Sequence, residues 1–250
     1  ADQAGLLSPV ESEILSRRLP AHLRQPDGRW FSISQRARII FYDREDVTDP
    51  PQTYEDLADP KYKGMICTRS SSNIYMLSLM GSMIAHHGAE KARAWAEGLY
   101  ANRARDPKGG DTDQLRGIVS GECEIVLANT YYFVRGLVGD VDGLSDGIER
   151  IGWVFPNQSD RGAHMNVSAA GVAVHAPNRD NAIRFLEYLT TDQAQKYFSN
   201  GNNEYPAVPG VGLGEGVARL GLFRQDGLNL EVLGENQPEA QMIYDAIGYE

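Results

Sequence analysis

The most regular pattern of apolar and polar residues lies in the middle of the chain. Short apolar runs rich in β-branched residues, at residues 37–42 and 124–128, are typical of buried strands. Between them, apolar residues recur three or four positions apart over residues 74–84, and a second helical stretch covers residues 89–100. Because strands alternate with helices, we predict an α/β fold with a mainly parallel sheet.

Tyrosines follow two of the predicted strands where a helix begins. Tyr131 and Tyr132 come directly after Asn129, a good N-cap residue at the end of the strand 124–128. Tyr75 comes after a serine-rich turn behind another predicted strand. In a parallel α/β layer these turns share the sheet edge where ligands bind, so the three phenols can converge on one cleft. The alternative is that they are ordinary packing residues among the twelve tyrosines of the chain.

Composition narrows the class of protein. The 250 residues allow one large or two small domains, and no apolar run reaches the length of a membrane helix. The net charge of −10, without a basic stripe, argues against binding to nucleic acid or to anionic lipid. The only cysteines are Cys67, in a strand predicted over residues 63–68, and Cys123, directly beside the strand predicted over residues 124–128. Two states stay open for them: a bridge in an oxidising compartment, or a buried pair of free thiols.

A cluster of three phenols favours a particular ligand chemistry. Ionising one ordinary phenol at pH 7 costs about 4 kcal/mol, so three phenolates require a hard, highly charged cation. Ferric iron suits such oxygen ligands better than zinc or copper, which prefer histidine and thiolate. Other candidates are weaker. His86 and His87 are expected to cap a helix before Gly88, and no nucleophile with a neighbouring base is visible.

Two motifs resemble a known family. The segments Ser70-Ser71-Ser72-Asn73-Ile74-Tyr75 and Ala128-Asn129-Thr130-Tyr131-Tyr132 are similar to the tyrosine motifs of bacterial periplasmic ferric-iron-binding proteins of ABC importers, in the cyanobacterial-type branch with a tyrosine-rich site. The resemblance extends over nearly the whole chain. It implies an α/β type II periplasmic binding architecture, with two lobes around a cleft.

The resemblance also implies roles for individual residues. Tyr75, Tyr131 and Tyr132 would be metal ligands that bind Fe(III) through phenolate oxygen, and Arg135 would lie beside the metal and balance phenolate charge. Arg36 is a candidate contact for an anion, with a solvated hinge charge as the alternative. A co-bound anion or water would complete the coordination sphere.

One departure from the family concerns the N-terminus. Family members carry a further His or Tyr ligand after their first strand, and His22, in a Pro-rich loop, does not match it. We therefore expect that sequence preceding Ala1, including a signal peptide, is absent and that the first lobe is incomplete. The predicted lobes are given by residue number: 1–36 and 162–212 for the remnant of the first, and 37–161 and 213–250 for the second.

The leading hypothesis is a periplasmic solute-binding protein, not an enzyme, which captures ferric iron as a monomer and delivers it to an ABC transporter permease in the inner membrane. Three alternatives stay open. The first is a periplasmic binding protein for a small organic or anionic solute, with the tyrosines as aromatic walls. The second is an α/β hydrolase or transferase, and the third is an interaction domain in which the tyrosines are structural.

Overall fold

The structure is a computed structural model that describes residues 1–249. These residues form two compact units. Unit 1 is assembled from three segments, Ala1–Arg36, Asn166–Gly221 and Leu228–Glu231. Unit 2 is assembled from Ala37–Met165, Leu222–Gly227 and the segment from Val232 on. Among the described residues, no helix has the length and apolar character needed to cross a membrane.

The sheet of unit 2 has the strand order β3-β4-β2-β5. These strands are β2 (Phe31–Asp43, which begins in unit 1), β3 (Ile66–Cys67), β4 (Ile125–Asn129) and β5 (Ile151–Val154). β3 and β4 are parallel, whereas β2 pairs antiparallel with both β4 and β5. The prediction of a mainly parallel sheet is therefore wrong. It assumed that successive strands are neighbours joined by crossover helices, but β2 lies between β4 and β5 and runs against both.

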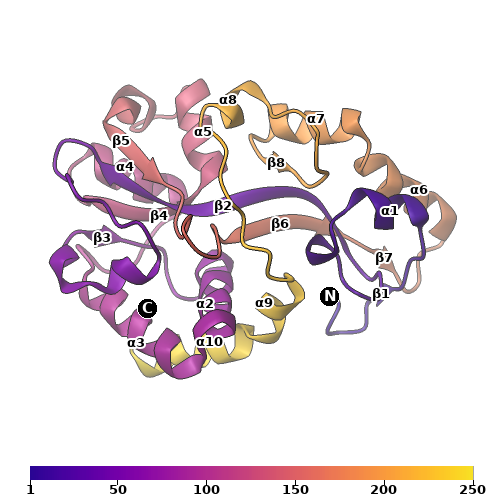
Figure 1. Cartoon of the computed structure of the whole chain (residues 1–250), viewed down its shortest axis with the longest axis horizontal. Coiled ribbons are helices and arrows are strands. Elements are labelled where there is room, and N and C mark those ends of the chain that lie inside the picture. The colour runs from indigo at the N-terminus through magenta and orange to yellow at the C-terminus, as the bar shows by residue number, and fades with distance from the viewer. Residues whose placement is uncertain (250) are drawn as a thin grey trace. The chain divides into compact units, whose positions relative to one another are not determined.

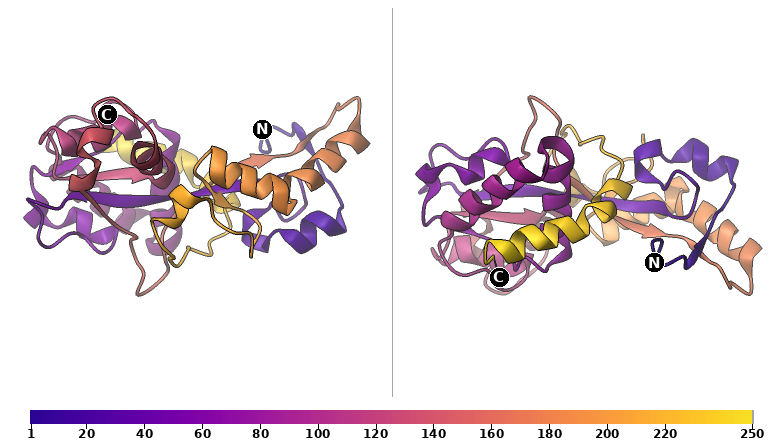
Figure 2. Two further views of the ribbon diagram at one scale, coloured as in Figure 1. Left: turned by 90° about the horizontal axis from the view of Figure 1, so that it is seen from above. Right: turned by 90° about the horizontal axis from the view of Figure 1, so that it is seen from below.

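Two groups of helices pack in unit 2. In the view of Figure 1, α2 (Ile74–His87), α3 (Ala89–Ala101) and α10 (Gln237–Ala246) lie together below the strands. Figure 2 shows α10 running beside α2 and α3, with which it is in contact. The other group is α4 (Asp111–Val119), which packs on β4, and α5 (Thr130–Val138).

The remaining elements of unit 2 are short. They are the 3₁₀ helices Glu55–Ala58, Pro60–Tyr62 and Ser145–Arg150, and helix α9 (Glu231–Glu235), which begins at the last residue of unit 1. The core of the unit is formed by the apolar residues of β4 together with those of α2, α3 and α10, among them Leu127, Met80 and Tyr244. This packing fixes the start of α2 relative to the end of β4.

Unit 1 has its own core and smaller sheets. β1 (Leu7–Ser8) pairs antiparallel with β7 (Val172–Ala173), and β6 (Met165–Ala170) and β8 (Tyr205–Pro206) pair with β2. Its helices are α1 (Glu13–Arg18), the 3₁₀ helix Ala21–Leu23, α6 (Arg179–Leu189), α7 (Asp192–Gly201) and α8 (Glu215–Ala218). Leu15, Phe31 and Leu186 are among the buried side chains that join these elements.

The two cysteines form a disulfide. Cys67 lies in β3 and Cys123 lies just before β4, with 5.7 Å between their Cα atoms. Of the two states left open by the sequence, the structure has the bridge. Gly117 of α4 makes room for it, because a Cβ atom at that position would lie 2.6 Å from the Cys123 sulfur.

Candidate functional site

The three tyrosines come from the starts of two helices that follow parallel strands. Tyr75 is the second residue of α2, and its backbone N–H donates to the capping side chain of Asn73 at 3.0 Å. Tyr131 and Tyr132 are the second and third residues of α5. Because β3 and β4 are parallel neighbours, their carboxyl ends reach the same edge of the sheet. The tyrosine motifs were predicted to meet at this edge.

The structure brings the three phenols together in unit 2. The hydroxyl oxygens of Tyr75 and Tyr131 are 3.3 Å apart, and the rings of Tyr131 and Tyr132 lie with their centroids 4.0 Å apart. All three side chains are half-buried. We call Tyr75, Tyr131 and Tyr132 the tyrosine cluster. Its arrangement presents neighbouring hard oxygen donors, while the role of each residue as a metal ligand stays a prediction.

The electrostatics of the cluster keep Tyr131 protonated in the absence of a cation. Burial raises the pKa of Tyr131 well above its ordinary value, and the neighbouring phenols of Tyr132 and Tyr75 raise it further. A phenolate at this position therefore requires positive charge brought in by a ligand. A bound metal ion supplies such charge and can keep its ligands ionised.

The two arginines predicted from the sequence have different surroundings. Arg135 is exposed on α5, with its guanidinium carbon 5.4 Å from the centre of the Tyr132 ring, and it donates to Thr112 Oγ1 at 3.0 Å. It therefore adjoins the tyrosine cluster. Arg36 belongs to unit 1, where it donates to Ser168 Oγ at 2.7 Å and pairs with the Glu204 carboxylate at 3.5 Å.

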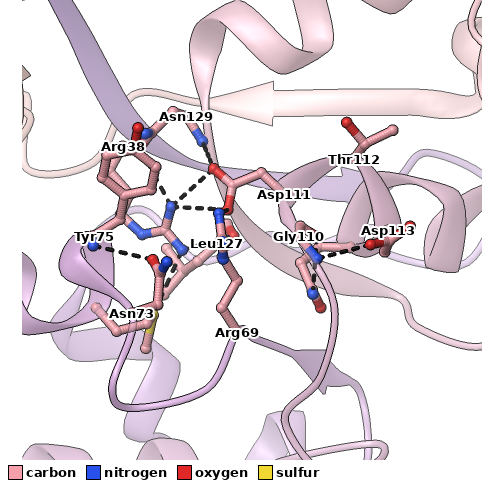
Figure 3. Close-up of polar contacts among 12 residues, drawn as sticks. Arg38, Arg69, Asn73, Tyr75, Gly110, Asp111, Thr112, Asp113, Leu127 and Asn129 are labelled. Carbon is pink, nitrogen blue, oxygen red and sulfur yellow. Dashed lines mark hydrogen bonds and ion pairs between the residues drawn. The ribbon is translucent and has the colours of Figure 1, made fainter.

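Three charged residues beside the cluster were missed by the sequence reasoning. Arg38 of β2, Arg69 after β3 and Asp111 at the start of α4 form an ion-paired group close to Tyr75 (Figure 3). We call them the charge cluster. One signal in the sequence could have revealed the group. Arg38 directly precedes the apolar run Ile39-Ile40-Phe41, so the predicted strand carries an arginine into the interior, where charged side chains are rare.

The remaining candidates have structural surroundings. His86 and His87 end α2, as expected, and their rings pair with Asp226 and Glu55, both at 2.7 Å. His164 is buried, and its ring Nε2 lies 3.1 Å from Ser78 Oγ. Over the part of the chain that the structure describes, no group of three or more histidine, cysteine, aspartate or glutamate side chains is placed to hold a metal ion.

Comparison with known proteins identifies the family. The profile of bacterial extracellular solute-binding proteins matches residues 1–215 of the chain. The chain belongs to this family. Iron uptake protein A2 of Synechocystis is 46% identical to this solute-binding protein. The alignment covers 100% of this chain and 73% of the relative.

Solved structures agree with the family assignment. The Trichodesmium protein IdiA (FutA), solved in complex with iron and citrate, is 43% identical and superposes with a TM-score of 0.96 over 100% of this chain and 79% of its own. The ferric binding protein of Campylobacter jejuni is 38% identical, with a TM-score of 0.93 over the same shares of the two chains. These matches confirm the predicted α/β type II periplasmic binding architecture. The relatives are solute-binding proteins rather than enzymes, in agreement with the prediction.

Proposed function

We propose that this solute-binding protein binds ferric iron through the phenolate oxygens of Tyr75, Tyr131 and Tyr132. The observation that carries the proposal is the 3.3 Å separation of the Tyr75 and Tyr131 hydroxyl oxygens at the ends of two parallel strands. Two oxygens that are each about 2 Å from one metal ion lie roughly 3 Å apart when they occupy adjacent coordination positions. The separation therefore suits two ligands of the same ion.

The donor chemistry selects the type of metal. Phenolates are hard, anionic oxygen donors, and ferric iron is a hard trivalent cation that repays the cost of ionising them. Burial and the neighbouring phenols make that cost greater at Tyr131. Similarity to the iron uptake protein of Synechocystis and to the iron-bound Trichodesmium protein supports the same ligand.

Charged and exogenous groups complete the proposed site. Arg135 beside Tyr132 balances phenolate charge, and water or a small anion fills the coordination positions that the three tyrosines leave. Arg36, paired with Glu204, stays a predicted anion contact. The predicted lobes, 1–36 with 162–212 and 37–161 with 213–250, are also part of the proposal, and all three tyrosines belong to the second.

The proposed cellular role is delivery of iron to an ABC transporter permease in the inner membrane. The family description, extracellular solute-binding protein, supports a periplasmic location. The Cys67–Cys123 disulfide fits this compartment, because disulfides persist in the oxidising bacterial periplasm. We further propose that the protein acts as a monomer and without nucleic acid.

A ferric titration tests the proposed ligand set. Adding ferric citrate to metal-free protein should produce a visible phenolate-to-iron charge-transfer band that saturates at one iron per chain. Tyr131→Phe and Tyr132→Phe should each weaken the band and the affinity. Tyr197→Phe is the matched control, since Tyr197 is 71% exposed on α7 of unit 1. The absence of a band, together with unchanged behaviour of both variants, would contradict the proposal.

A further inference from the structure

The charge cluster is buried and tightly connected. The side chains of Arg38 and Asp111 are completely inaccessible to solvent and pair at 3.1 Å, and Arg69, with 18% of its side chain exposed, reaches the other carboxylate oxygen at 3.4 Å. Asp111 also accepts the backbone N–H of Asn129 at 2.8 Å, and Arg38 donates to the carbonyl oxygen of Leu127 at 3.1 Å. Figure 3 shows the contacts from Arg38, Arg69 and Asn129 converging on the Asp111 carboxylate.

Such a cluster is a poor means of stabilising a fold. Removing charged groups from water costs free energy that their mutual attraction seldom repays, and apolar side chains of similar volume often serve as well. Moreover, two guanidinium groups face a single carboxylate, so the three side chains carry a net charge of +1. An excess positive charge in the interior of unit 2 indicates a purpose other than packing.

The excess charge lies against one of the proposed iron ligands. The guanidinium carbons of Arg38 and Arg69 are 5.8 and 5.7 Å from the centre of the Tyr75 ring. A cation at this distance attracts the electron-rich face of an aromatic ring. The attraction strengthens when the phenol becomes a phenolate, because negative charge then spreads into the ring.

We propose that Arg69 is a positioning residue for iron binding, which orients Tyr75 and stabilises its phenolate in the metal complex. The Asp111 carboxylate holds Arg69 in place, and it pairs with Arg38 at the same time. The inference rests on the proposed function, since it assigns a partner to one of the three proposed ligands. It also gives a role to the turn before α4, whose first residue, Asp111, anchors the guanidinium groups.

Arg69 is the member of the cluster that can be replaced. It is partly exposed, and Asp111 keeps Arg38 as a partner when Arg69 is removed, so no buried carboxylate is left unpaired. Arg69→Met removes the charge, and Arg69→Lys keeps it. Arg103→Met is the matched control, because Arg103 also lies over a tyrosine ring, 3.9 Å from the centre of Tyr100, and pairs with an aspartate.

The test measures ferric affinity in competition with citrate. Each substitution is made both in the wild-type protein and in the Tyr75→Phe variant. Arg69→Met should weaken binding about 5- to 30-fold, the range expected for a partly buried guanidinium over an aromatic ring. Its charge-transfer band should move to longer wavelength, because the phenolate loses a stabilising positive charge. Arg69→Lys should restore most of the affinity, and Arg103→Met should bind as the wild type does. In the Tyr75→Phe background, Arg69→Met should have no further effect.

Each other outcome has a definite meaning. Equal losses in both backgrounds, or no loss and no spectral shift, would overturn the role of Arg69 while leaving the iron function intact. A wild-type protein that binds no ferric iron would instead overturn the proposed function, and this inference with it. Circular dichroism checks that the variants fold. If Arg69→Met unfolds, Arg69→Gln takes its place, because it removes the charge but keeps a donor for Asp111.

Discussion

Binding of ferric iron should release one proton for each phenol that becomes a ligand. An ordinary phenol titrates near pH 10, so only about one in a thousand is ionised at pH 7. At Tyr131, burial and the neighbouring phenols raise the pKa further and make the ionised fraction smaller. The metal must therefore displace the protons itself.

The geometry explains why the protons leave only when the metal arrives. Two negative oxygens at the 3.3 Å separation of Tyr75 and Tyr131 would repel each other by about 5 kcal/mol at an effective dielectric constant of about 20. Tyr131 thus stays protonated without the metal, and binding should release one proton for each of the three tyrosines that becomes a phenolate ligand.

The apparent association constant should then rise with pH by about three logarithmic units per pH unit, since protons compete with iron for the same oxygens. Replacing one tyrosine by phenylalanine should lower this slope to about two. Between pH 6 and pH 8 the corresponding changes are about 10⁶-fold and 10⁴-fold.

The assay is competition for ferric iron against one chelator at several pH values. The pH dependence of the chelator cancels when the slopes of the wild type and a variant are subtracted. The slope for Tyr75→Phe, Tyr131→Phe and Tyr132→Phe should in each case be about one lower than the wild-type slope. The exposed-tyrosine control Tyr197→Phe should keep the wild-type slope. If Tyr131→Phe retains the wild-type slope, Tyr131 does not bind the metal as a phenolate and the reasoning is refuted.

Three further predictions concern stability. The Cys67–Cys123 bridge spans 56 residues in sequence, so reduction should lower the free energy of unfolding in urea by about 4 kcal/mol; a midpoint that does not respond to reductant would contradict this. Burial, and then the positive charges nearby, lower the pKa of His164 to about 3, so the folded protein keeps it neutral. Stability should be lost as pH falls below about 6.5, by about 2 kcal/mol at pH 5, and His164→Gln should flatten this part of a pH-dependent urea series. The Tyr54 hydroxyl donates to the Arg38 carbonyl oxygen at 2.6 Å and accepts from the backbone N–H of His164 at 2.9 Å. Tyr54→Phe should therefore lower the free energy of unfolding by about 1–3 kcal/mol. A thermal midpoint equal to that of the wild type would count against these bonds.

Local signals located the tyrosine motifs correctly. A β-branched run followed by an N-cap residue marks the end of β4 and the start of α5, and the serine-rich turn with Asn73 marks the start of α2. These signals act over a few residues, so they survive in the sequence. The parallel pairing of β3 with β4 is a long-range feature. It was expected as part of a mainly parallel sheet, whereas β2 runs antiparallel to both β4 and β5.

The charge cluster shows why other parts of the site escaped prediction. Arg38, Arg69 and Asp111 are far apart in sequence, and each reads alone as an unremarkable charge. Their pairing depends on β2 lying beside β4 in the antiparallel direction, since Arg38 is opposite Asn129 in that register. The state of Cys67 and Cys123 was undecided for the same reason, because spacing alone does not give the distance between two Cα atoms.

The α/β class, the family resemblance, the acidic character of the chain and the residue type suited to a hard cation all follow from the amino-acid sequence. Periodicity, capping and side-chain chemistry are local properties, and they are sufficient for those conclusions. Three features become visible only in the folded chain: the Tyr75 and Tyr131 hydroxyls lie 3.3 Å apart, the cysteines are joined, and two arginines adjoin Tyr75. Each of these features depends on strand order and direction, which are fixed by burial of the core as a whole and not by any single segment.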